Sequence, residues 1–299
     1  MAGVATVARP QLRVLPATAR TNVTLAPHAI ARFATRALWD ELALYPKPGL
    51  VSLGDSGSHA DMDGSTFVRS LFALRGHFRA MAAAGACAAP FSELRDLGLR
   101  AEAAMLSATR GVNTHRGAIF ALGLLGAATA LTSARAQTLD GRTLRETLHS
   151  TWRRALEERP AGPPPFSHGV QAAERYGASG ARGEACAGFP SVFDVALPAL
   201  RAARQQGHDA RRARLGALFA LLESVEDTNI LYRGGSAGLE YVRRSARDFR
   251  AAGGVDTPDA IVRAERIHRE FVARGLSPGG CADLLASALF IDAVQAATP

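Results

Sequence analysis

The stretch from Tyr45 to Asp63 is the part of the sequence whose side chains could most readily do chemistry together. It has neither a helical nor a strand period, and it carries two prolines, three glycines, one lysine, one histidine and three aspartates: Lys47, His59, Asp55, Asp61 and Asp63. A structureless run this long between two helical patterns is usually functional or disordered. Its aspartates offer the hard oxygen ligands that a divalent cation takes, which indicates a functional loop.

Lys47 is the single lysine of the chain, because the other 34 of its 35 basic residues are arginines. A composition with this bias uses arginine wherever a generic positive charge is enough. A lysine ammonium is a compact point charge, whereas a guanidinium is a planar fork. We therefore predict that Lys47 contacts a phosphate oxygen at a place where a guanidinium does not fit. The alternative is a surface lysine without function.

Four further polar breaks containing glycine adjoin apolar helical patterns, at residues 111–117, 167–184, 226–235 and 277–283. They add further charged or titratable side chains: His115, Arg116, His168, Arg182, Glu184, Asp227, Arg233 and Asp283. Acids and bases mixed at helix ends suit a metal–triphosphate complex, in which the acids hold Mg²⁺ and the bases hold phosphates. The alternative is that these residues are separate helix caps and surface ion pairs.

The segment from Gly111 to Phe120 predicts a helix start that binds an anion. Asn113 or Thr114 is expected to cap the helix, and the free N–H groups of a helix start attract phosphate. His115 and Arg116 would lie in that first turn, where two positive groups are unfavourable unless an anion lies between them.

The chain between these breaks reads as one all-α domain of about ten helices, with the active site in interhelix loops. Apolar residues recur at helical spacing, and no segment reads as a strand. Glu41 is expected in the last turn of the first helix, Asp63 is expected to cap the second, and Pro90 and Ser92 to open the third. Besides that third helix, the predicted helices are 27–44, 64–86, 140–158, 190–206, 209–226, 236–252 and 258–274. The nearly uncharged stretch 117–134 just reaches the length of a membrane span. Its glycines and hydroxyl residues favour a buried core helix, and we expect no second candidate span.

Composition limits the partners. The 299 residues have a net charge of +8 and a pI of about 10.3, which suits polyanions such as nucleic acid or phosphorylated small molecules. No nucleic-acid-binding motif is visible. Three separated cysteines predict reduced thiols in a cytoplasmic protein. Residues 1–26 lack the apolar segment of a secretory signal, so we expect a flexible tail followed by one domain over 27–299.

Several motifs occur in an order that resembles a known family: PKPGLV at 46–51, HADM at 59–62, GVNTHRGAIF at 111–120, YGASGARGEA at 176–185, GFP at 188–190, DTN at 227–229, RGG at 233–235 and SPGGCADLLA at 277–286. Together they resemble the triphosphoribosyl-dephospho-CoA synthase family over about residues 30–295. One departure is Arg116, where lysine is expected in many members.

The resemblance implies a transferase that uses ATP as a glycosyl donor. It would join the 5-triphosphoribosyl group to the 2′-hydroxyl of 3′-dephospho-CoA and release adenine. The product would pass to a transferase that loads the acyl carrier protein of malonate decarboxylase or citrate lyase, a choice that the sequence leaves open.

We assign roles to the site residues on this basis as hypotheses. The reaction breaks the C1′–N9 bond through an oxocarbenium-like state and needs a base, a contact to adenine and a hold on the triphosphate. The expected base is Glu184, the adenine contacts are His59 or His168, the phosphate ligands are Lys47, His115, Arg116, Arg182 and Arg233, and the Mg²⁺ ligands are Asp61, Asp227, Asp283 and Glu41. Two other functions remain open: a Mg²⁺-dependent hydrolase of a nucleotide or ADP-ribose N-glycosidic bond, and a basic nucleic-acid-binding module.

Overall fold

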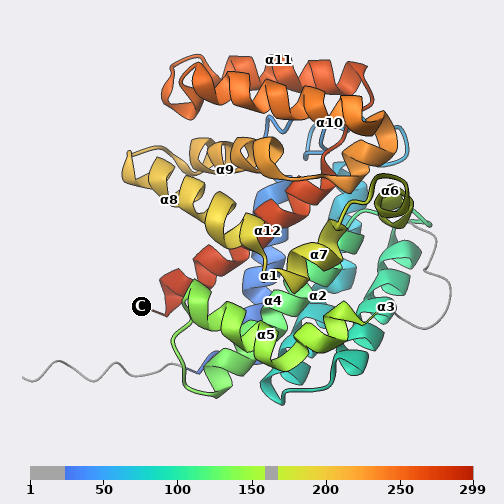
Figure 1. Cartoon of the computed structure of the whole chain (residues 1–299), viewed down its shortest axis with the longest axis vertical. Helices are drawn as coiled ribbons and strands as arrows, with labels where there is room; N and C mark the ends of the chain where they lie inside the picture. Colours follow the sequence, from blue (N-terminus) through green and yellow to red (C-terminus); the bar gives the residue numbers. More distant parts are fainter. Residues whose placement is uncertain (1–23, 159–167, 299) are drawn as a thin grey trace, which may run out of the picture.

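The computed structural model describes residues 24–158 and 168–298, and this part of the chain is all-α without a strand (Figure 1). Its helices are α1 (Pro27–Leu42), α2 (Gly64–Ala86), α3 (Phe91–Ala108), α4 (Arg116–Ala134), α5 (Gly141–Glu157), α6 (His168–Tyr176), α7 (Gly180–Cys186), η1 (Ser191–Ala196), α8 (Leu197–Gln205), α9 (Ala210–Ser224), α10 (Thr228–Ala251), η2 (Gly254–Asp256), α11 (Ala260–Ala273) and α12 (Gly279–Ala297). The predicted fold class is confirmed, with twelve α-helices in the described residues where about ten were expected. Of the expected tail, residues 1–23 lie outside the described residues.

Two apolar helices form the centre of the fold. Helix α4 packs against α2, α12 and α1, and α12 crosses the molecule between α1 and α4 on one side and α8 and α9 on the other (Figure 1). Helices α2 and α4 approach closely at Gly85, because a Cβ there would lie 2.3 Å from the carbonyl oxygen of Ala127. Close backbone approach of this kind needs a glycine.

Both central helices are long and apolar enough to cross a membrane. Arg116–Ala134 is the predicted core helix, and 83% of its most apolar window is buried inside the fold. Gly279–Ala297 also meets the criteria of length and composition, with 56% of its window buried, so the expectation of a single candidate was wrong. Other helices of the fold cover α4, so it is a core helix as predicted. Helix α12 is also packed against other helices.

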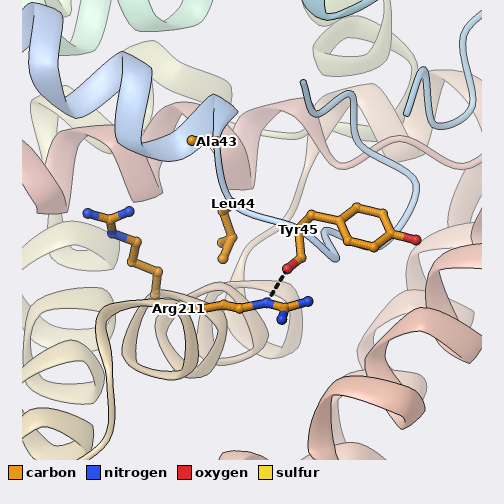
Figure 2. Close-up of a pocket in the computed structure, with 5 residues that line it drawn as sticks. Ala43, Leu44, Tyr45 and Arg211 are labelled. Atoms are coloured by element: carbon orange, nitrogen blue, oxygen red, sulfur yellow. Dashed lines mark hydrogen bonds between the residues drawn. The ribbon is translucent and has the colours of Figure 1, made fainter. Parts of the chain in front are cut away.

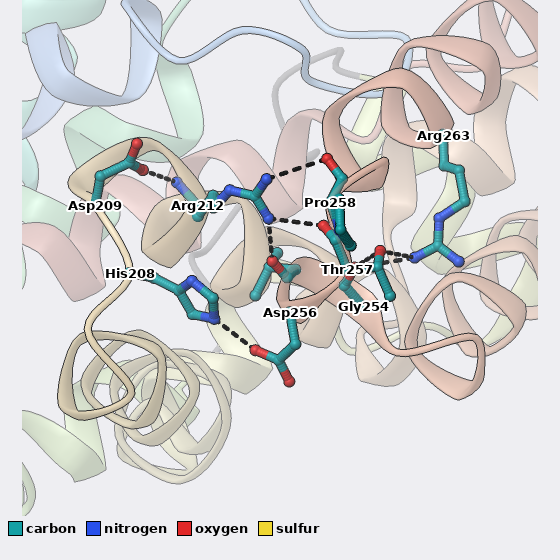
Figure 3. Close-up of polar contacts among 9 residues, drawn as sticks. His208, Asp209, Arg212, Gly254, Asp256, Thr257, Pro258 and Arg263 are labelled. Carbon is teal, nitrogen blue, oxygen red and sulfur yellow. Dashed lines mark hydrogen bonds and ion pairs between the residues drawn. The ribbon is translucent and has the colours of Figure 1, made fainter.

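A polar network fixes the start of α9 against the segment before α11 (Figure 3). Asp209 caps α9, and Arg212 in its first turn donates to the carbonyl oxygens of Val255 and Thr257, at 2.5 and 2.9 Å. His208 lies 2.5 Å from Asp256 on the same side. This network orients α9, whose Arg211 contacts the loop over residues 43–63 between α1 and α2, which we call the first loop.

Several predicted boundaries were wrong where a cap or a proline acts locally. The expected break at 226–235 is helical from Thr228, because the Asp227 side chain caps α10, and the helix is interrupted only at Gly235 (φ 62°, ψ −164°). The stretch 167–184 contains the two short helices α6 and α7. The expected helix 190–206 begins as π-helical η1. Pro198 has no N–H for the turn before it, and a wide turn is one way to accommodate that loss.

Candidate active site

The side chains of Glu41 and Lys47 form a buried ion pair at the first loop. Lys47 Nζ lies 2.5 Å from Glu41 Oε1, and the two residues are 1% and 4% exposed. Burial lowers the pKa of Lys47 and raises the pKa of Glu41, while the charge of each partner opposes the shift of the other. The lysine that was predicted to meet a phosphate therefore meets a carboxylate of its own chain, at the C-terminal turn of α1.

The loop around Lys47 is held by α11 and the segment after it. His268 Nδ1 donates to the carbonyl oxygen of Lys47 at 2.7 Å, and its Nε2 lies 3.3 Å from Asp55 Oδ2. Gly49 has φ 69°, and a Cβ there would lie 2.0 Å from the carbonyl oxygen of Leu276. The backbone at Lys47 is thus fixed from a helix more than 200 residues away in sequence. His268 was missed at the sequence level because it sits in an ordinary amphipathic helix.

A pocket of about 280 Å³ lies behind this loop, lined by Ala43, Leu44, Tyr45, Arg211 and Arg214 (Figure 2). Arg211 Nε donates to the carbonyl oxygen of Tyr45 at 2.6 Å, as the dashed line in Figure 2 shows. Arg214 pairs with Asp40 at 2.9 Å. These two arginines of α9 anchor the end of α1 and the start of the loop, the two segments that carry Glu41 and Lys47.

His115 lies buried at the start of α4. Its Nδ1 is 2.7 Å from Ser70 Oγ, and its Nε2 is buried without a hydrogen-bond partner among the described residues. Burial, assisted by the charge of Lys47, lowers the pKa of His115 to about 3. The imidazole is therefore neutral at neutral pH, and the pair of positive groups expected at this helix start is reduced to Arg116.

The carboxylate of Asp283 lies at the same helix start. A Cβ on Gly117 would lie 2.0 Å from its Oδ2, and the nearby backbone N–H of Ala118 acts to lower its pKa. The anion site predicted at the start of α4 thus holds a carboxylate from α12. Burial raises the pKa of Asp283 well above its ordinary value, and the negative charges of Glu41 and Asp227 raise it further.

Asp227 joins the start of α10 to the start of α12. Its Oδ1 accepts the N–H groups of Asn229 and Ile230, at 2.8 and 3.3 Å, and its Oδ2 accepts the N–H of Cys281 at 2.8 Å. Burial raises the pKa of this carboxyl group, against the effect of those hydrogen bonds. A Cβ on Gly280 would lie 3.0 Å from Asp227 Oδ2, which favours a glycine at that position.

These five side chains form what we call the acid–lysine cluster: Glu41, Lys47, His115, Asp227 and Asp283. Lys47 acts electrostatically on His115, and both Glu41 and Asp227 act on Asp283. The end of α1 and four of the five predicted breaks contribute to it. The predicted convergence of distant turns is therefore found for these residues. Within residues 24–158 and 168–298, no group of three or more histidine, cysteine, aspartate or glutamate side chains is close enough to hold a metal ion by itself.

A second polar group lies where the first loop meets the start of α10. Arg233 Nη2 is 3.2 Å from His59 Nδ1, and its Nη1 donates to the carbonyl oxygens of Ser58 and Gly275, each at 3.2 Å. His59 Nε2 is 2.9 Å from Ser277 Oγ. Burial and the charge of Arg233 lower the pKa of His59. The exposed Asp61 side chain lies 3.4 Å from His59 and outside the acid–lysine cluster.

Arg116, Arg182 and Glu184 have partners elsewhere, and the roles assigned to them and to His168 stay predictions. Arg116 pairs with Glu102 of α3 at 2.8 Å. Arg182 Nε donates to the carbonyl oxygen of Leu156 at 2.5 Å, at the end of α5. Glu184 accepts the N–H of Ser191 at 2.7 Å and its hydroxyl at 3.0 Å, and burial raises the pKa of this carboxyl group. His168 begins α6, but its side chain lies outside the described residues.

Comparison with known proteins agrees with this arrangement of motifs. Residues 27–299 match the family described as ATP:dephospho-CoA triphosphoribosyl transferase. The chain belongs to this family. The resemblance stated from the sequence is confirmed, and with it the transferase class.

Relatives of this triphosphoribosyl transferase family cover nearly the whole chain. A probable 2-(5''-triphosphoribosyl)-3'-dephosphocoenzyme-A synthase of Pseudomonas fluorescens (strain Pf0-1) is 43% identical, covering 92% of this chain and 94% of its own. Proteins of the same name from Pseudomonas putida and Acinetobacter calcoaceticus are 42% and 38% identical, covering 91% and 88% of this chain and 96% and 89% of theirs. No solved structure matches the chain.

Proposed function

We propose that the acid–lysine cluster is where this transferase moves the 5-triphosphoribosyl group of ATP to the 2′-hydroxyl of 3′-dephospho-CoA. The observation that carries the proposal is that buried ionisable groups from separate breaks meet at the starts of α4, α10 and α12. Buried groups with displaced pKa values gather at functional sites. The cluster contains segments of the motifs on which the family resemblance rests.

The reaction breaks the bond between C1′ of the ribose and N9 of adenine while the 2′-hydroxyl attacks. The positive charge that develops on the ribose is stabilised by nearby carboxylates, and Glu41, Asp227 and Asp283 supply these within the cluster. Glu184 remains our candidate for the group that accepts the hydroxyl proton, because a raised pKa improves a carboxylate as a base. His59, held by Arg233 and Ser277, remains the candidate for contact with adenine.

The cluster also suits Mg²⁺ bound together with the triphosphate. Three carboxyl groups face one lysine there, and mutual repulsion contributes to the raised pKa of Asp283. A divalent cation would relieve that repulsion. Mg²⁺ is commonly held by one or two carboxylates and substrate phosphates instead of a complete protein cage, so Glu41 and Asp283 are the proposed ligands. When bound, the ion would neutralise charge on the triphosphate.

The test is to mix the protein with ATP, Mg²⁺ and dephospho-CoA, then measure free adenine by chromatography and the mass of the CoA compound. Adenine release matched by a mass gain of one triphosphoribosyl group is expected. Adenine release that does not depend on dephospho-CoA would instead favour the hydrolase, and salt-sensitive DNA binding without ATP consumption would favour the nucleic-acid-binding module. Chelation of Mg²⁺ is expected to stop adenine release.

The product would then serve as the prosthetic-group precursor for an acyl carrier protein of the malonate decarboxylase or citrate lyase type. We propose that a second transferase accepts it in the cytoplasm. Purified carrier proteins of the two types, offered together with that transferase, would distinguish the two systems by which of them gains mass.

A further inference from the structure

The pocket between the end of α1 and the start of α9 has a lining that carries positive charge and no carboxylate. Its volume is about 280 Å³, and it is lined by Ala43, Leu44, Tyr45, Arg211 and Arg214 (Figure 2). A hollow lined by one sign of charge focuses the electric field and raises the local concentration of the opposite ion. The lining of this pocket therefore suits an anion.

Arg211 is the cation of the pocket with free hydrogen-bond donors. Its Nε donates to the carbonyl oxygen of Tyr45 at 2.6 Å, and it makes no other hydrogen bond or ion pair with the described part of the chain. Both of its Nη atoms are thus available, and the residue is exposed, so a ligand can reach them from solvent. The bond to Tyr45 holds the guanidinium in place, which lowers the entropy cost of binding a ligand.

Arg214 adds positive charge to the pocket although a carboxylate pairs with it. Its Nη2 lies 2.9 Å from Asp40 Oδ2, while Nε of Arg36 lies 3.0 Å from Oδ1 of the same carboxylate. One negative charge is therefore shared by two guanidinium groups. Together with Arg211, these side chains keep an excess of positive charge at this end of α1.

The pocket and the acid–lysine cluster lie along one short segment of the chain. Ala43 and Tyr45 of the lining stand between Glu41 and Lys47 in sequence, each two residues from a member of the cluster. The Cα atoms of residues two apart are separated by at most about 7 Å. A ligand with one group in the pocket is therefore close enough to extend to the cluster.

We propose that this pocket is the phosphate subsite for the acceptor, in which Arg211 binds the diphosphate group of 3′-dephospho-CoA. This inference rests on the proposed function, in which the triphosphate of the donor lies with Mg²⁺ at Glu41 and Asp283. The acceptor must bring its 2′-hydroxyl to the same cluster, so it needs a phosphate site nearby that the donor does not occupy. A guanidinium binds phosphate oxygens through two parallel hydrogen bonds. The volume of the pocket is at the small end for ligand sites, which suits a diphosphate group with the rest of the acceptor outside.

Two kinds of variant in the full chain test this subsite. Arg211→Gln removes the free donors, and its control is Arg135→Gln, which replaces an exposed arginine after the far end of α4. Ala43→Glu adds a carboxylate to the lining and leaves Arg211 in the chain, and its control is Ala43→Gln, which has the same size without the charge. The KM for each substrate is measured from adenine release. Binding of dephospho-CoA and of inorganic pyrophosphate is measured by calorimetry without ATP or Mg²⁺.

We expect Arg211→Gln to raise the KM for dephospho-CoA about tenfold or more, because a charge-assisted hydrogen bond is lost. The KM for ATP should stay unchanged, and the binding of dephospho-CoA and pyrophosphate should weaken by a similar factor. Ala43→Glu should raise the KM for dephospho-CoA about tenfold above that of Ala43→Gln. Arg135→Gln should behave as wild type in every measurement.

An unchanged KM for dephospho-CoA in Arg211→Gln would overturn the proposal. A rise in the KM for ATP alone would also overturn it, because the pocket would then belong to the donor. A lower melting temperature of Arg211→Gln with intact binding of dephospho-CoA would leave this residue only its structural contact with Tyr45. If the wild-type protein releases no adenine, the proposed function fails, while the calorimetry of wild type and Arg211→Gln still decides whether the pocket binds a diphosphate.

Discussion

The ion pair between Glu41 and Lys47 leads to the sharpest prediction about the site. Both side chains are almost completely buried, and Nζ lies 2.5 Å from Oε1. Lys47→Met keeps most of the volume of the side chain but leaves the Glu41 carboxylate buried without its partner. Removal of one partner of a buried pair costs about 3–5 kcal/mol, whereas replacement of both by neutral groups is often close to neutral.

We therefore expect Lys47→Met to lower the free energy of unfolding by about 3 kcal/mol or more. Glu41→Gln should also be destabilising, and Glu41→Gln/Lys47→Met should recover most of the loss. Urea unfolding of the four proteins at pH 7 measures the coupling energy directly. A double variant that is no more stable than either single variant would refute the view that each buried charge is stabilised mainly by its partner.

Adenine release by the same proteins separates stability from function. The double variant should fold and yet lose turnover, since it lacks both the point charge proposed for phosphate and a proposed Mg²⁺ ligand. Lys47→Arg should lose turnover as well, because the longer planar fork does not fit the space of an ammonium. Wild-type turnover in Lys47→Arg would refute the argument from the single lysine.

Two further predictions concern the helices around α4. Gly117→Ala would place a Cβ 2.0 Å from Asp283 Oδ2, so it should displace that carboxylate and reduce adenine release by roughly 100-fold. In the control Gly76→Ala the new Cβ meets nothing within 4 Å. The control should keep full activity, and its free energy of unfolding should rise by about 0.5–1 kcal/mol. Burial lowers the pKa of His77 from 6.5 to about 4, so the unfolded chain takes up this proton first as pH falls. The free energy of unfolding should therefore drop by about 2 kcal/mol on this account between pH 8 and pH 5. Urea unfolding at the two pH values should show a smaller drop for His77→Leu than for wild type, and an equal drop would contradict the assignment.

Much of the fold could be predicted from local patterns. Asp63 was expected to cap a helix over 64–86, and it does so through a reciprocal capping box with Thr66. The nearly uncharged stretch before Ala134 was expected to be a core helix and lies buried in α4. These features depend on interactions between residues that are close in sequence, so a single segment is enough to predict them. The π-helical start of η1 and the helical residues after Asp227 were missed, since each depends on how a helix end is bonded.

The partners of charged side chains could not be predicted from the sequence in the same way. Asp283 was expected to hold a metal, which stays a prediction, but the sequence did not indicate that its carboxylate lies against Gly117 at the start of α4. Arg116 was placed at the same helix start, but its guanidinium turns to Glu102. Which way a side chain turns depends on the rotation and packing of helices that are distant in sequence. His268 gave no sequence signal, because histidine is an ordinary residue of amphipathic helices.

The sequence by itself determined the family, the all-α class and the breaks that contribute to the site, because the order of motifs and the hydrophobic period are properties of the sequence. Only the tertiary structure decided that Lys47 meets Glu41 and that the Asp283 side chain of α12 lies against the start of α4. Charges interact through space over a few ångströms. Their pairing is set when helices pack, and spacing along the chain does not contain that information.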